Sequence, residues 1–160
     1  MENNFRELLN MDNKEFKQIL NCTACKEGFK AAFGGWFRES NDCIVTLDLQ
    51  KSGYGNYYYV NIKIYIHGVF NSHYSICKEI VKNDLGAFST RPPKLYENIL
   101  NLDLQMEDDE RKLQLQTLFS DFITPFTDKA LTLNGIKELV DKGQLLLLPA
   151  VKKELGKLSF

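Results

Sequence analysis

The sequence lacks the features that mark several large classes of protein. Its longest apolar run, Leu145–Leu148, is far shorter than the ~20 residues of a membrane-spanning helix. It also has no excess of one charge, with 20 Lys and Arg against 21 Asp and Glu, spread evenly over both halves. A general nucleic-acid binder takes its affinity from neutralised phosphates and would show a basic stripe. We therefore expect neither a membrane nor a nucleic acid as partner.

Cysteine and histidine are scarce, with four and two residues respectively. Cys22 and Cys25 form a C-x-x-C pair, but they fall near the C-terminal end of a predicted helix, where the helix dipole works against a thiolate. A zinc site would need two further ligands, and there is no second pair of this kind. We expect small buried thiols, no metal and no cofactor. Residues 1–10 lack the apolar core of a signal peptide, so we expect a cytoplasmic protein.

The length and the composition are those of one ordinary globular domain. The chain has 160 residues, of which 44% are hydrophobic and 26% charged. We predict a single domain over residues 1–160, with an α+β core over 12–105 and a C-terminal helical part over 106–160.

The chain is organised around a hairpin predicted over Cys43–Gly68. Its two strands are joined by a loop at Lys51–Asn56, which is rich in the residues that accept a positive φ. Side chains alternate along both strands with the period of two that a sheet requires. One face is apolar and must be buried, and we expect helices to cover it. That face holds Val45, Leu47, Leu49, Val60, Ile62, Ile64 and Ile66.

The opposite face of the hairpin mixes tyrosines with amides and charges, which suits a surface that meets a partner. From it we select six residues as a candidate binding surface: Gln50, Tyr57, Tyr59, Asn61, Lys63 and Tyr65. The alternative is that these tyrosines cover a solvated sheet face or pack under the C-terminal segment.

Helices are predicted on both sides of this hairpin. Asp12 and Glu15 form a capping box at the start of the first helix, which Gly28 ends. A short helical segment is expected around Phe5–Leu9. Asp108 opens a long amphipathic helix that Pro125 should interrupt.

Weaker patterns predict the remaining elements. Residues 29–39 suggest one short strand, Tyr74–Lys82 a short helix, and Leu85–Ser89 and Leu100–Leu104 further strands joined by a rigid Arg91-Pro92-Pro93 connection. Thr132 or Asn134 restarts a helix that ends at Gly143, and a last short helix spans Ala150–Leu155. This order of elements is typical of an α+β domain, in which helices pack on one face of an antiparallel sheet.

Three short motifs resemble a bacterial family, domain of unknown function 4304. They are Gly28-Phe29-Lys30, Phe37-Arg38, and the run from Leu49 to Asn61 that contains Gln50-Lys51-Ser52, Tyr54-Gly55-Asn56 and Tyr58-Tyr59. The resemblance covers residues 12–68 and extends more loosely to about 105. It implies an α+β domain of bacterial origin and no activity, so it assigns no catalytic residue.

No arrangement of residues in the sequence has the convergence of an active site. The loop Gly53–Asn56 lacks the helix that a phosphate cradle needs, and a hairpin turn explains its glycines. Ser52 and His67 belong to opposite ends of the hairpin, too far apart for a catalytic pair.

Two functions are open at this point. The first is a non-enzymatic protein-interaction module that uses the candidate surface. The second is an enzyme or small-ligand binder with a pocket between that face and the C-terminal helices, lined by Gln50, Asn61, Lys63 and Arg91.

Overall fold

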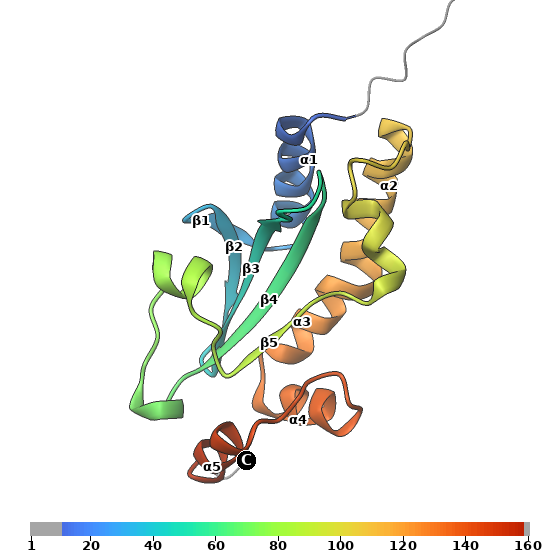
Figure 1. The fold of residues 1–160 in the computed structure, drawn as a ribbon. Helices are drawn as coiled ribbons and strands as arrows, with labels where there is room; N and C mark the ends of the chain where they lie inside the picture. The colour runs from blue at the N-terminus through green and yellow to red at the C-terminus, as the bar shows by residue number, and fades with distance from the viewer. Residues whose placement is uncertain (1–10, 159–160) are drawn as a thin grey trace, which may run out of the picture.

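The computed structural model describes residues 11–158, which form an antiparallel sheet with helices packed on one face (Figure 1). This confirms the predicted α+β class. The predicted helical segment around Phe5–Leu9 lies outside the described residues. The strands neighbour one another in chain order: β1 (Lys30–Ala32), β2 (Gly35–Glu39), β3 (Cys43–Lys51), β4 (Tyr58–Ile66) and β5 (Phe88–Thr90).

The predicted hairpin is the pair β3–β4, and its register confirms the two predicted faces. Leu47 lies opposite Ile62, and Leu49 lies opposite Val60. The apolar side of this pair belongs to the main core, in which Leu49 is only partly buried. Tyr58 joins the same face, because its ring stacks on Phe16 with centroids 5.4 Å apart.

The single strand expected over residues 29–39 is two strands. β1 and β2 pair through a two-residue turn at Phe33 and Gly34, whose φ angles are +51° and +76°. Two successive positive φ values are typical of the type I′ turn, whose twist matches that of the strands it joins. The glycine pair in the sequence therefore marks a hairpin.

Helices cover the apolar face of the sheet, as predicted. α1 (Asn13–Lys26) precedes the sheet; after it come α2 (Asp108–Leu118), α3 (Thr124–Ala130), α4 (Leu133–Asp141) and α5 (Pro149–Gly156). All five contribute buried side chains to the main core. No helix within residues 11–158 is long and apolar enough to cross a bilayer.

Local capping rules account for where these helices begin and end. The Asp12 carboxylate accepts a hydrogen bond from the Glu15 N–H at 2.8 Å, and the Thr132 hydroxyl accepts one from the Gly135 N–H at 3.0 Å. Gly28 and Gly143 follow α1 and α4 with φ of +90° and +72°. The predicted start at Asp12 is confirmed, and of the two starts predicted for the later helix, Thr132 is the one that the structure has.

The long helix is interrupted before Pro125, as expected, and the interruption is a π turn. This turn, η4 (Phe119–Ile123), lies between α2 and α3, and the Thr124 N–H bonds to the Phe119 carbonyl. Proline has no N–H to offer the carbonyl four residues earlier, so a helix that approaches it must change its hydrogen bonding. The three segments still form one continuous rod (Figure 1).

Two of the weaker expectations need correction. Within Tyr74–Lys82 only the end is helical, as the π turn η2 (Glu79–Asn83). The strand expected over Leu100–Leu104 is wrong: this stretch follows the 3-10 helix η3 (Lys94–Leu100) and forms a turn. The Asn101 side chain accepts from the Asp103 N–H at 3.0 Å, and such a bond favours a turn over a ladder.

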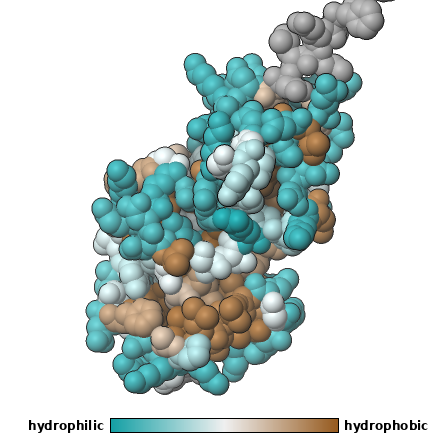
Figure 2. Space-filling model, viewed as in Figure 1, coloured by the Kyte–Doolittle hydropathy of each residue, from teal (hydrophilic) through white to brown (hydrophobic). Residues whose placement is uncertain are grey.

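The leucine run after α4 is only half buried. Leu145 belongs to the core, whereas Leu146 and Leu148 are 78% and 50% exposed. Figure 2 shows apolar atoms gathered at this lower end of the molecule, where α4 and α5 lie.

The turn η2 lies directly on the sheet because β2 begins with a glycine. A Cβ atom at Gly35 would stand 2.5 Å from the Leu47 carbonyl oxygen and 2.6 Å from Cγ1 of Val81. The Gly35 backbone conformation itself is open to any residue. The absence of a side chain is what allows Val81 to approach.

We predict that Gly35→Ala destabilises the fold by about 1–3 kcal/mol, because two fixed neighbours must move. The matched control is Gly156→Ala, where a Cβ meets nothing within 4 Å; it should be neutral or stabilise by roughly 0.4–1 kcal/mol. Urea unfolding of the two variants beside wild type measures both values. Equal stability of Gly35→Ala and wild type would contradict the close contact.

Candidate functional site

The polar face of the hairpin is covered over one half of its length. Residues 74–83, which include η2, pack on it: Tyr74, Ile76, Cys77 and Ile80 form a second small core with Phe37, Ile44 and Tyr65. The covering segment is not the C-terminal one, because the C-terminal helices pack on the apolar face.

Two of the six predicted surface residues lie beneath this segment. The Tyr65 hydroxyl donates to the Ile80 carbonyl at 2.7 Å, and the Lys63 ammonium donates to the Val81 carbonyl at 2.8 Å. Their exposed fractions are 1% and 3%. Lys63 and Tyr65 are therefore not surface residues, and they hold η2 on the sheet.

The other four predicted residues lie on the uncovered half, and Arg91 contacts three of them. Arg91 Nε donates to Asn61 Oδ1 at 2.9 Å, and Arg91 Nη2 donates to Gln50 Oε1 at 3.3 Å. The guanidinium carbon lies 4.1 Å from the centroid of the Tyr59 ring, within cation–π range. Tyr57 meets Tyr59 edge to face at 5.7 Å. We call Gln50, Tyr57, Tyr59, Asn61 and Arg91 the Arg91 platform.

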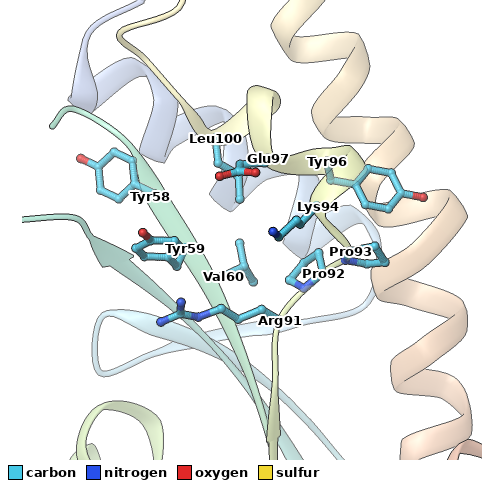
Figure 3. Close-up of a pocket in the computed structure, with 10 residues that line it drawn as sticks. All are labelled: Tyr58, Tyr59, Val60, Arg91, Pro92, Pro93, Lys94, Tyr96, Glu97 and Leu100. Atoms are coloured by element: carbon cyan, nitrogen blue, oxygen red, sulfur yellow. The ribbon is translucent and has the colours of Figure 1, made fainter. Parts of the chain in front are cut away.

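An apolar pocket of about 250 Å³ lies on one side of the platform (Figure 3). It is formed between β4 and the stretch that leads from β5 into η3. Tyrosine and proline side chains dominate its lining, with Lys94 and Glu97 among the charged residues: Tyr58, Tyr59, Val60, Arg91, Pro92, Pro93, Lys94, Tyr96, Glu97 and Leu100. The Arg91-Pro92-Pro93 connection, expected only as a rigid turn, is one wall of this pocket.

A polar groove of about 760 Å³ lies on the other side of the platform. Its lining includes Gln50, Asn61 and Arg91 from the platform, Lys63 from β4 and Lys82 from η2. Lys82 forms a 2.5 Å ion pair with Asp48. Burial lowers the pKa of Lys63, an effect that the nearby Asp48 and Asp84 carboxylates oppose.

The pocket predicted between the polar face and the C-terminal helices needs one correction. Gln50, Asn61, Lys63 and Arg91 do line a single groove, as expected of them. The groove is walled by residues 82–85 and 89–91 and not by the C-terminal helices, which pack on the apolar face of the sheet. Lys82 and Tyr96 were missed because their segments have no clear period.

The loop at the tip of the hairpin is fixed from the side. The Asn56 N–H donates to the Asp103 carboxylate at 2.8 Å, and the Asn56 carbonyl accepts from the Leu102 N–H at 2.9 Å. Tyr57 also bridges to Asn101. The turn at residues 101–103, predicted as a strand, thus supports the Tyr57 end of the platform.

The cysteines differ from the expectation of buried thiols. Cys22 and Cys25 are exposed on α1, and only Cys43 is fully buried. Burial, with a contribution from Asp42, raises the pKa of the Cys43 thiol to about 12. Within residues 11–158, no three His, Cys, Asp or Glu side chains are grouped to hold a metal ion.

The histidines lie together at the far end of the hairpin from Ser52. The rings of His67 and His73 stack with centroids 4.1 Å apart, just after β4 ends at Ile66. Ser52 follows Lys51, whose partner Tyr58 is at the other end of β4. Ser52 therefore does not pair with either histidine.

Comparison with known proteins places the chain in one family. Residues 21–129 match the model of DUF4304, described as a domain of unknown function, and the chain belongs to this family. The match extends beyond residue 105 and takes in α2 and most of α3. No curated protein sequence matches the chain. No solved structure matches it either.

The division of the polar face predicts unequal losses of stability for two chemically identical substitutions. Tyr65→Phe leaves the buried Ile80 carbonyl without its donor and should cost about 1–3 kcal/mol of stability. Tyr59→Phe removes a hydroxyl from the half-exposed platform and should change stability by less than roughly 0.5 kcal/mol. Thermal and urea unfolding measure both. A Tyr59→Phe loss equal to that of Tyr65→Phe would contradict this division.

Proposed function

We propose that the chain is a non-enzymatic protein-interaction module that binds a protein partner over the Arg91 platform. The observation that carries this proposal is the stack of Arg91 on Tyr59, set at an accessible position between two hollows. Tyrosine and arginine are the residue types most enriched among residues that dominate binding energies at protein interfaces.

Preorganisation of the platform supports the same proposal. Arg91 is held by Gln50 and Asn61, and the Asn61 amide also donates to Gln50 at 3.0 Å. A surface that is already ordered loses less side-chain entropy when a partner docks. Tyr57 and Tyr59 add contact area with few rotatable bonds.

The chemistry of the two hollows favours binding over catalysis. Their lining residues include neither histidine nor cysteine, and Asp48 is ion-paired with Lys82. A nucleophile with a neighbouring base is the arrangement that covalent catalysis needs. The groove residues engage one another in structural hydrogen bonds instead.

Site-specific photo-crosslinking in extract of the source organism tests this function. A benzophenone amino acid at Ser89, an exposed residue of the groove, should give one discrete protein adduct. The same group at Leu113, which is 63% exposed on α2, should not give that adduct. Tyr59→Ala in the Ser89 background should reduce its yield at least several-fold, since hot-spot truncations cost about 2 kcal/mol or more.

Circular dichroism of each variant confirms that it is folded. Adducts of equal yield from the Ser89 and Leu113 positions would contradict a dedicated surface. Absence of any protein adduct from Ser89 would contradict the protein-interaction function and favour a small ligand.

A further inference from the structure

The apolar pocket and the polar groove meet at one side chain. Arg91 contributes to the lining of both, and Tyr59, on which it stacks, lines the apolar one. Figure 3 shows the Arg91 side chain extending beneath the Tyr59 ring, away from Pro93. A single extended ligand that crosses Arg91 would therefore touch both hollows.

The charges in the groove are not balanced. Lys63, Lys82 and Arg91 face Asp48 and Asp84, and the Asp48–Lys82 ion pair removes one charge of each sign. Neither Lys63 nor Arg91 forms a salt bridge within residues 11–158. Two cations thus remain against the single carboxylate of Asp84.

Lys63 strengthens the preference of the groove for an anion because it is buried. Its side chain is 3% exposed, yet its ammonium makes a single hydrogen bond among the described residues, to the Val81 carbonyl. An ammonium carries three donors, so two are left for other partners. A buried cation with spare donors is stabilised by an anion that enters the groove.

Hydrogen-bond donors also predominate on the platform side of the groove. The carbonyl oxygens of Gln50 and Asn61 are turned toward Arg91, and the Gln50 amide nitrogen makes no hydrogen bond within residues 11–158. Arg91 Nη1 is likewise without a partner there. A planar guanidinium with a neighbouring amide N–H matches the two oxygens of a carboxylate.

The apolar pocket fits a single side chain better than a whole ligand. Its volume of about 250 Å³ is below the roughly 300–1,000 Å³ of sites for drug-sized molecules. Its walls are mostly tyrosine rings, prolines and aliphatic side chains, and the charged residues among them are Arg91, Lys94 and Glu97. An aliphatic or aromatic side chain of a partner is the occupant that this lining favours.

We propose that the partner docks through an acidic segment, with a Glu or Asp carboxylate in the polar groove and a neighbouring apolar side chain in the apolar pocket. This inference rests on the proposed function and specifies the partner by its chemistry. Arg91 would contact both the carboxylate and the apolar side chain of the partner, because it borders both hollows.

Binding of the full chain to an array of extended peptides tests the inference. Each peptide carries one Leu or Phe and two Glu residues at varied spacing, and matched peptides carry Gln for Glu or Ala for the apolar residue. The acidic apolar peptides should bind, and both replacements should weaken binding. Higher NaCl should weaken it further, because exposed charges are screened.

Two variants of equal charge change provide the internal control. Arg91→Gln should lower the affinity for the best peptide about tenfold or more, since it removes a charge-assisted hydrogen-bond partner. Lys137→Gln removes a cation from an exposed position on α4, remote from the groove, and should leave the affinity within about twofold. Equal binding of Glu and Gln peptides, or an unaffected Arg91→Gln variant, overturns the inference.

The peptide and crosslinking experiments can contradict the acidic segment and the proposed function separately. If a Ser89 adduct forms but no acidic peptide binds, the proposed function holds and the acidic chemistry is wrong. If acidic peptides bind through Arg91 but no adduct forms, the carboxylate site holds and the proposed function is wrong. If free glutarate binds as tightly as the best peptide, a small dicarboxylate is the ligand, and the docked segment is overturned.

Discussion

The contact between the turn η2 and the polar face of the sheet is the constraint on which the rest of this structure depends. Gly35 admits Val81 to the sheet surface, and Tyr65 and Lys63 bind the carbonyls of Ile80 and Val81. A sheet covered by helices on one face could leave its other face to solvent. Here the segment that leaves β4 returns across that face before it re-enters the sheet as β5.

This return path creates the candidate site. After the covering segment the chain enters β5 and then continues through Arg91 into the prolines. Arg91 therefore arrives beside the uncovered residues Gln50, Tyr59 and Asn61, from which it is distant in sequence. The groove lies between the turn and the platform, and the apolar pocket lies beyond it. The contact with η2 and the proposed binding platform thus occupy neighbouring halves of one sheet face.

The sequence predicts this fold wherever the physical rule is local. Alternation along β3 and β4, the caps at Asp12 and Thr132 and the break before Pro125 each depend on residues a few positions apart. Alternation assigns a side chain to a face, but it does not say what lies above that face. Tyr65 and Tyr59 alternate alike, and only the path of residues 74–83 makes one buried and the other half-exposed. The alternating leucines at 100–104 predicted a strand that does not form. There the turn at Asn101 determines the conformation.

Hydroxyl-radical footprinting of the tyrosines, read by mass spectrometry, tests the central claim most directly. It reports the solvent access of every tyrosine in the native chain without any substitution. The account predicts strong labelling of Tyr54, which is 97% exposed, intermediate labelling of Tyr57 and Tyr59, and protection of Tyr65, which is 1% exposed. Labelling of Tyr65 at the rate of Tyr59 would show that η2 does not cover the sheet, and would contradict both the divided face and the groove beside it.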